Sequence, residues 1–291
     1  MTTIWDHLEE LKRRLKVILI SLLASTAFFM IFPADPADFF NAILTGMYRP
    51  AVSLALIWIK DYIAPKGLQI ISLEIGAPLG VYFTASFLFG FIVSSPIIAY
   101  ELFKFIDPAL YPNERRAVYP FVTAFTVLFI VGAAFGLFLL APFITYTLII
   151  FSQVVGSQPV LSVMDFYSMT FATVLYTGIG FTTPAIFLLL VRLGIAKTSM
   201  ITKNRVYVYF IVYVATAFIT PDGGPLADFA LFIPLMAMLE ITILIAKRYE
   251  RRAKDSAITG EVVETSKKCK FCGSRMGNNK IFCPKCGKSQ S

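Results

Sequence analysis

Long uncharged stretches alternate with short polar segments along this chain of 291 residues. The uncharged stretches run over residues 17–34, 76–100, 117–164, 166–191 and 206–221. A helix that crosses the roughly 30 Å core of a bilayer needs about 20 apolar residues, and most of these stretches approach or exceed that length. The pattern therefore predicts an all-α integral membrane protein, because a transmembrane barrel would show short segments of alternating polarity instead.

The stretches predict six membrane-spanning helices. We expect them at about residues 16–32, 77–103, 116–140, 166–191, 206–219 and 226–246. The last two are predicted to be short and to form a hairpin that need not cross the full bilayer core. Pro96 predicts a break or kink in the second helix. Residues 141–164 are expected to form an outer loop, since Gly156 and Pro159 interrupt them.

Two polar segments flank the first predicted span. Residues 5–16, WDHLEELKRRLK, have the pattern of an amphipathic helical head with Asp6 as its N-cap. No small-residue cleavage site follows the span, so we expect it to remain as an anchor. Residues 33–75 are predicted to form a long loop in which a short amphipathic helix precedes Pro65.

The net charge of +8 is distributed unevenly about the predicted spans. One side of the membrane receives most of the lysines and arginines, whereas the other receives only Arg49, Lys60 and Lys66. Basic residues concentrate on the cytoplasmic side of membrane proteins, so both termini are predicted to be cytoplasmic. The basic excess thus reflects topology, and we expect no nucleic-acid partner.

The composition changes abruptly after the last predicted span. We divide the chain into a membrane domain (1–247), a polar linker (248–268) and a C-terminal unit (269–291). All four cysteines lie in that unit, as two C-x-x-C pairs: Cys269, Cys272, Cys283 and Cys286. Four thiolates at this spacing predict a small cytoplasmic zinc ribbon whose folding depends on the metal. A thiol redox pair or a disulfide framework is the alternative, which the cytoplasmic side disfavours.

The membrane domain shows no catalytic pattern. The single histidine is His7, and the sequence lacks metalloprotease, serine-hydrolase and phosphate-binding motifs. We therefore expect a protein that is not an enzyme. Asp228 and Glu240 lie within a predicted span, where an acid usually has a function. For Glu240, a solvated position near Lys247 is an equally good interpretation.

Five segments resemble the TatC family, the multi-spanning receptor subunit of the twin-arginine protein translocase. They are HLEELKRRL (7–15), FIDPALYPNERRAVYP (105–120), GIGFTTPAI (178–186), ITPD (219–222) and LEI (239–241). The resemblance covers about residues 4–247 and excludes the cysteine unit. It implies a multi-pass protein of the cytoplasmic membrane, with six helices forming a concave wall and with both termini in the cytoplasm.

The resemblance also implies a function and partners. A TatC-like chain would bind signal peptides that contain two adjacent arginines and would export folded proteins using the proton-motive force. Its partners would be single-span TatA/TatB-type subunits, membrane lipid and further copies of the chain within the complex.

Three residues match family positions that bind signal peptides, namely Glu10, Phe105 and Glu114. Carboxylates suit this task because arginine pairs with them through two parallel hydrogen bonds. Each residue also has a plainer interpretation. Glu114 can act as a first-turn acid of the third helix, and Phe105 as an interface anchor. Glu10 can pair with Arg14 at i+4.

Three further positions match family residues tied to function or assembly: Pro50, Asp222 and Glu240. Thr182 departs from the family pattern, since it stands where the family often has a membrane-embedded acid or amide. Its hydroxyl can still form a hydrogen bond, but an ionisable group is missing from this part of the fourth span.

Two other functions are open on the sequence. A secondary transporter of a small solute would need polar groups near the bilayer midplane on several helices, and this chain offers few. A membrane-anchored interaction module would act through the zinc ribbon and use the spans as a scaffold.

Overall fold

The computed structural model describes residues 4–34, 50–65, 68–106, 118–192, 196–219, 224–264, 266–277, 282 and 285–289. The helices are α1 (Ile4–Ile31), α3 (Ala51–Ile63), α4 (Ala77–Ile106), α5 (Val118–Phe135), η4 (Gly136–Leu140), α6 (Ala141–Val154), α7 (Val163–Arg192), α8 (Thr198–Lys203), α9 (Arg205–Ile219) and α10 (Gly224–Glu264). Five helical segments are long and apolar enough to cross a membrane: 8–31, 77–105, 121–154, 163–191 and 224–248. The prediction of an all-α, multi-pass membrane protein is therefore confirmed.

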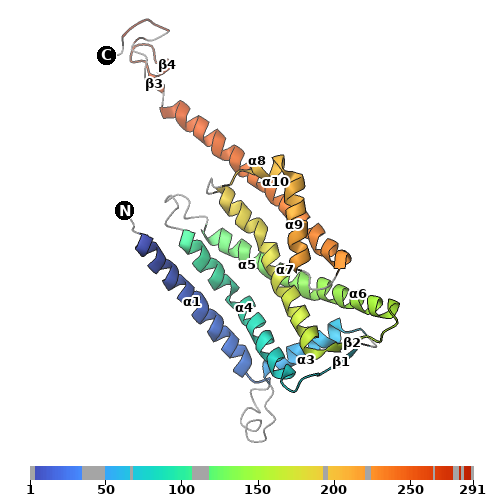
Figure 1. Ribbon diagram of the computed structural model, residues 1–291. Coiled ribbons are helices and arrows are strands. Elements are labelled where there is room, and N and C mark those ends of the chain that lie inside the picture. Colours follow the sequence, from blue (N-terminus) through green and yellow to red (C-terminus); the bar gives the residue numbers. More distant parts are fainter. Residues whose placement is uncertain are drawn as a thin grey trace.

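The helices form a bundle in which α1 and α4 lie side by side along one edge and α7 runs through the middle (Figure 1). The start of α1 and the C-terminal extension of α10 lie at one end of this bundle (Figure 1). The short helix α3 and the strands β1 (Gln69–Ile71) and β2 (Val160–Ser162) lie at the other end. The short helix expected before Pro65 is thus confirmed as α3.

Small residues bring neighbouring helices into close contact. A Cβ atom added to Gly132 of α5 would lie 2.6 Å from Phe181 Cβ of α7. One added to Gly178 of α7 would lie 2.7 Å from the ring of Phe129 in α5. Between α4 and α1, a Cβ on Gly90 would lie 2.6 Å from Thr26 Oγ1. Helix association in membranes depends on such close approach, because lipid offers no hydrophobic driving force between helices.

The first predicted span and its amphipathic head form a single helix. Because α1 begins at Ile4, Asp6 lies inside the helix, and its prediction as an N-cap is wrong. The head consists mainly of leucine, glutamate, lysine and arginine, which favour helix as strongly as the apolar span does. No turn is therefore needed between them.

The predicted break at Pro96 is also wrong, because α4 continues through it to Ile106. Proline removes the N–H that would bond to the carbonyl four residues earlier, here Ile92. The Ser95 hydroxyl donates to this Ile92 oxygen at 2.8 Å. A neighbouring serine thus replaces the missing donor, as is usual for prolines in transmembrane helices.

Residues 141–154 are helical, which corrects the loop predicted for 141–164. The chain passes from α5 through the π-helical turn η4 into α6, whose first turn contains Pro142. Pro142 lies inside this continuous helix and cannot donate to the Phe138 carbonyl four residues earlier, which instead accepts from the Tyr62 hydroxyl at 3.1 Å. The predicted loop is confined to the residues after Val154, where Gly156 has φ +77° and β2 then pairs in parallel with β1.

The last two predicted spans differ in length. Helix α9 has 15 residues, as expected, whereas α10 has 41 and contains a 25-residue apolar segment. The prediction of a short sixth span is therefore wrong. Helix α10 also continues through residues 248–264 of the predicted linker, where arginine, lysine, glutamate and alanine favour helix. The Glu250 carboxylate accepts bonds from Thr198 N at 2.8 Å and from Thr198 Oγ1 at 2.5 Å, which attaches this extension to α8.

Candidate functional site

Three charged side chains, here called the Arg14 cluster, meet near the start of α1. Arg14 forms an ion pair with Glu10, one turn earlier in α1. Its Nη1 donates to Glu101 Oε2 of α4 at 3.3 Å. The side chain of Arg14 is only 8% exposed, and those of Glu10 and Glu101 are 24% and 13% exposed. The cluster is therefore a largely buried charged link between two helices.

Helical spacing explains one half of the cluster and tertiary structure the other. Residues four apart lie on one helix face, so the pairing of Glu10 with Arg14 predicted from sequence is confirmed. Sequence reasoning missed Glu101. One signal was available: Glu101 is the single acid that ends the uncharged stretch 76–100, and that end of the second predicted span was expected on the same side of the membrane as residues 5–16.

The Arg14 guanidinium bonds to two carboxylates, one on each helix. The Arg14 Nε atom is buried and has no hydrogen-bond acceptor in the part of the chain that the structure describes. Burial strengthens these charge interactions. A guanidinium fits such carboxylates better than an ammonium does.

Phe105 follows Glu101 by one helical turn in α4 and is half-buried. Phe103, between them, is fully buried and packs against Phe121 of α5 with ring centroids 5.3 Å apart. Because residues four apart share a helix face, Phe105 lies on the same face of α4 as Glu101. The structure thus brings Phe105 to the same end of the α1–α4 pair as Glu10.

A polar pocket of about 690 Å³ lies beside the cluster along α1. Its lining includes Glu9, Glu10, Lys12, Arg13 and Lys16. Glu10 therefore contacts the buried Arg14 and also lines an open pocket, where a ligand can reach it.

Glu114 and Asp222 lie outside the described residues. The expectation that Glu114 approaches Glu10 therefore stays a prediction.

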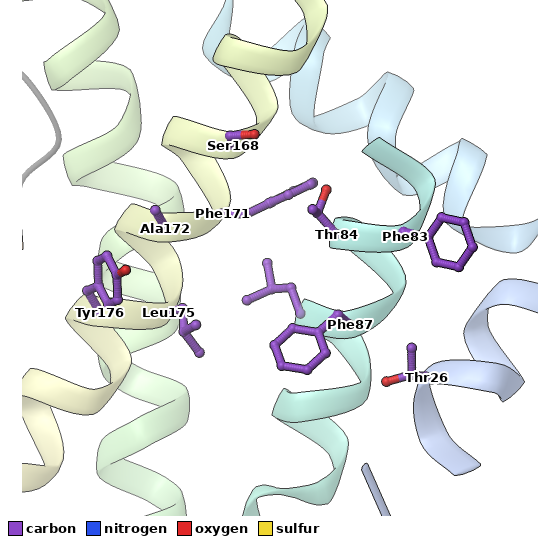
Figure 2. Close-up of a pocket in the computed structure, with 10 residues that line it drawn as sticks. Thr26, Phe83, Thr84, Phe87, Ser168, Phe171, Ala172, Leu175 and Tyr176 are labelled. Atoms are coloured by element: carbon purple, nitrogen blue, oxygen red, sulfur yellow. The ribbon is translucent and has the colours of Figure 1, made fainter. Parts of the chain in front are cut away.

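A second pocket, of about 470 Å³, opens between α1, α4 and α7. Figure 2 shows Thr84 and Phe87 of α4 on the side that faces Phe171 and Leu175 of α7. Phe83 also lines the pocket, although its ring points away from α7. Its lining, which also includes Leu88, Ala172 and Tyr176, is almost entirely apolar. Thr26 of α1 borders the pocket. At about 1.5 Å per residue, Thr26 lies about 24 Å along α1 from Glu10.

Glu240 of α10 is 32% exposed and contacts two residues of α9. The Tyr209 hydroxyl donates to its Oε1 atom, and Arg205 Nη2 lies 3.4 Å from Oε2. This arrangement, here called the Glu240 cluster, attaches the short helix α9 to α10.

Thr182 and Pro50 both have defined local roles. Thr182 is buried, and its hydroxyl donates to the Ile179 carbonyl at 2.7 Å within α7. Pro50 precedes α3 and pairs as an isolated β-bridge with Pro33, while Ala51 N donates to Phe32 O at 2.8 Å. Pro50 therefore lies where the residues after α1 meet the start of α3.

Three of the four cysteines lie close together. The Sγ atoms of Cys269, Cys272 and Cys286 are within 4.8 Å of one another, whereas Cys283 lies outside the described residues. Strands β3 (Ser266–Lys268) and β4 (Arg275–Gly277) form a hairpin around the first pair. Gly273 and Gly287 each follow a C-x-x-C pair directly. Their φ angles are +70° and +69°, values that residues with a side chain rarely adopt. This group can bind a metal ion.

Similar proteins identify the membrane domain. The family model "Sec-independent protein translocase protein (TatC)" matches residues 6–234. TatCy of Bacillus subtilis (strain 168) is 30% identical over 252 residues, which cover 87% of this chain and 91% of that protein. TatC of Aquifex aeolicus (strain VF5) is 29% identical over 252 residues, which cover 86% of this chain and 97% of that protein.

Solved structures agree with these relatives. A crystal structure of the twin-arginine translocase receptor TatC matches with a TM-score of 0.63 at 29% identity. The match covers 83% of this chain and 98% of that one. A second TatC crystal structure, in DDM, matches with a TM-score of 0.65 at 27% identity. This match covers 82% of this chain and 99% of that one.

The family match ends at residue 234, before the cysteine unit, in agreement with the resemblance in the sequence. TatC proteins are components of a protein translocase, so the expectation of a transport protein rather than an enzyme is confirmed. The chain belongs to the TatC family of Sec-independent protein translocase proteins.

Proposed function

We propose that this chain binds twin-arginine signal peptides of folded cargo at the cytoplasmic face of the cell membrane. The observation that supports this most directly is the Arg14 cluster, a largely buried group in which Glu10 already binds a guanidinium and also lines an open polar pocket. The recognition residues are Glu10, Phe105 and Glu114. A peptide arginine would form parallel hydrogen bonds to a carboxylate, which lysine cannot do.

The apolar part of the signal peptide would lie along α1 toward the pocket of Figure 2. A peptide helix that starts at Glu10 needs about 16 residues to reach the level of Thr26. An apolar helix in an apolar groove is a common recognition mode, and the phenylalanines of α4 and α7 supply the surface. The two pockets thus suit the charged and the apolar parts of one ligand.

Export then requires partners. Single-span TatA/TatB-type subunits would assemble with the chain in the membrane, both termini would be cytoplasmic, and the proton-motive force would drive transport. The segment 8–31 of α1 is only 6% buried within the chain, and α9 exposes Val206, Phe210 and Phe218. These surfaces are available to partner helices and to further copies of the chain. Pro50, Asp222, Glu240 and Thr182 are the residues proposed for function or assembly.

The test is binding of a fluorescent signal peptide to the purified protein in detergent. Two versions of the peptide, one with Arg-Arg and one with Lys-Lys, are each tested on the wild type, on Glu10→Gln and on Glu114→Gln. We expect Lys-Lys and each variant to weaken binding by about 1.5–3 kcal/mol, as for a charge-assisted hydrogen bond. Glu74→Gln, an exposed acid just before α4 at the opposite end of the bundle, is the matched control. Binding that follows peptide hydrophobicity alone, without a preference for arginine, would refute the proposal.

We also propose that the C-terminal unit binds zinc through Cys269, Cys272, Cys283 and Cys286 as a structural ribbon. The Sγ atoms of Cys269 and Cys286 are 3.6 Å apart. This is too far for a disulfide but close to the about 3.8 Å that tetrahedral zinc with 2.3 Å bonds imposes. The membrane domain (1–247), linker (248–268) and ribbon (269–291) would then be separate units along the chain.

Metal analysis of the purified chain tests this assignment. We expect about one zinc per chain, lost in Cys272→Ser, and a thiolate charge-transfer band when cobalt replaces zinc. The chain has no cysteine outside this unit, so thiol titration before and after chelation reports on this site alone. Four titratable thiols without chelator, or a stable disulfide, would contradict the assignment.

A further inference from the structure

The C-terminal end of the chain is much more basic than the rest. Residues 265–291 contain seven of the 26 lysines and arginines and none of the 18 acids, so they supply seven of the eight net positive charges. The seven are Lys267, Lys268, Lys270, Arg275, Lys280, Lys285 and Lys288. Four thiolates on one zinc ion carry a net charge of −2, so the ribbon keeps a positive excess after it binds the metal.

Membrane topology does not explain these seven charges. Basic residues determine orientation within about 15–20 residues of a span, and the ribbon starts about that far after the apolar segment of α10 ends at Arg248. Helix α10 continues to Glu264 and carries β3 and β4 beyond the end of the bundle (Figure 1). At about 1.5 Å per residue this extension is about 24 Å long, whereas salt screens charges over about 8–10 Å. The ribbon is therefore placed to meet a polyanion in solution rather than the lipid headgroups beside α10.

Exposed aromatic rings accompany the lysines. Phe271 and Phe282 are 61% and 63% exposed, although burial of such large apolar side chains is favourable. Lys268, Lys285 and Lys288 are exposed as well, and Lys288 Nζ lies 4.6 Å from the centre of the Phe271 ring. Both rings adjoin the metal-binding pairs, since Phe271 lies within the first C-x-x-C pair and Phe282 directly precedes the second. The folded ribbon thus presents cationic and aromatic groups together.

We propose that the C-terminal ribbon binds single-stranded RNA. Lysines attract the phosphates of a strand, and exposed aromatic rings stack on its unpaired bases whatever their sequence. A duplex offers few accessible base faces, and an acidic protein segment offers no flat group to either ring. The inference rests on the zinc ribbon and the cytoplasmic C-terminus of the proposed function. The basic residues beside the spans, from which no nucleic-acid partner was expected, are a separate set.

The test measures the fluorescence anisotropy of a labelled oligouridine mixed with the full chain in detergent. The oligouridine has about 20 nucleotides, more than the roughly 4–16 that a small single-strand-binding domain covers. Phe271→Ala should weaken binding about fivefold or more, through lost stacking, without changing its salt dependence. Lys285→Gln should reduce the slope of log affinity against log salt concentration by about 0.7, because one phosphate contact is lost. Phe151→Ala of α6 and Lys203→Gln of α8 change exposed residues of the same types outside the ribbon and should leave binding unchanged.

Other outcomes overturn the inference in favour of a different partner. Duplex RNA that binds as tightly as the oligouridine, or ribbon variants that bind like wild type, would exclude a site for single strands. RNA binding that is lost in nanodiscs of anionic phospholipid but kept in zwitterionic ones would assign the ribbon to the membrane surface. Polyglutamate that competes as strongly as unlabelled oligouridine would assign it to acidic proteins.

Zinc content and signal-peptide binding, measured on the same preparations, separate the possible failures. Zinc content also shows whether Phe271→Ala and Lys285→Gln still fold the ribbon, and neither change should alter the affinity for the signal peptide. A chain that contains zinc and binds the signal peptide but not RNA refutes this inference alone. A chain without zinc refutes the ribbon assignment and this inference with it.

Discussion

The Arg14 cluster and the Glu240 cluster use the same chemistry in different surroundings. Each joins two helices through an arginine and a glutamate, α1 to α4 in one case and α9 to α10 in the other. Arg14 is 8% exposed and shared by two acids, whereas Arg205 is 47% exposed and serves one acid, which also accepts from Tyr209. The comparison shows that the same two residue types can form either a buried or an exposed link between helices, depending on which helix faces meet.

The largest expected effect comes from removing the arginine of the buried cluster. Arg14→Leu removes the guanidinium that bonds to both Glu10 and Glu101 and should lower the free energy of unfolding by about 3–5 kcal/mol. The matched change Arg205→Leu at the exposed cluster should cost less than about 1 kcal/mol. Unfolding in mixed micelles, followed by circular dichroism, measures both. Equal losses would show that the two clusters do not differ in burial as described.

A smaller effect is expected at the second attachment of α1 to α4. Gly90→Ala places a methyl group against Thr26, at 2.6 Å from Oγ1 and 2.8 Å from the backbone nitrogen. Because backbone must shift to make room, we expect a loss of about 1–3 kcal/mol. Gly180→Ala is the control, since the nearest atoms of Leu235 lie at 3.7 Å, an ordinary contact distance. A neutral Gly90→Ala would mean that α1 is fastened by the Arg14 cluster alone.

The smallest effect is expected within the Glu240 cluster. Tyr209→Phe removes the hydroxyl that donates to Glu240 and leaves Arg205 as its partner. We expect a loss of about 0.5–1.5 kcal/mol and no change in signal-peptide affinity. Thermal unfolding and the peptide-binding assay test the two statements separately. A change in affinity would bring the α9–α10 hairpin into the recognition site and weaken the contrast between the clusters.

Much of the bundle was predictable from local pattern, and the errors have local causes as well. The apolar stretches predicted the long helices in the right order, but only five segments among the described residues are long enough to cross a membrane, so the count of six spans stays a prediction. The break at Pro96 was wrong because a serine hydroxyl replaces the missing donor. The loop at 141–154 was wrong because the helix continues through Pro142, where a tyrosine hydroxyl bonds to the carbonyl to which the proline cannot donate. The length of α10 was underestimated because its charged residues end the membrane segment without ending the helix.

The candidate site was only half predictable. The pairing of Glu10 with Arg14 follows from i,i+4 spacing in one helix, and the close approach of three cysteines follows from two C-x-x-C pairs close in sequence. Glu101 could not be assigned in this way. It lies 87 residues from Arg14, and nothing in either segment specifies which faces of α1 and α4 meet.

The sequence by itself determined that this protein is a helical membrane protein of the TatC family, with its cysteines confined to a separate C-terminal unit. These properties depend on composition, period and short motifs, which are fixed along the chain. Only the tertiary structure decided that Arg14 is buried between two acids and that Gly90 packs directly against Thr26. Burial and charge balance arise where faces of different helices meet, and those faces are selected by packing over the whole bundle rather than by neighbouring residues.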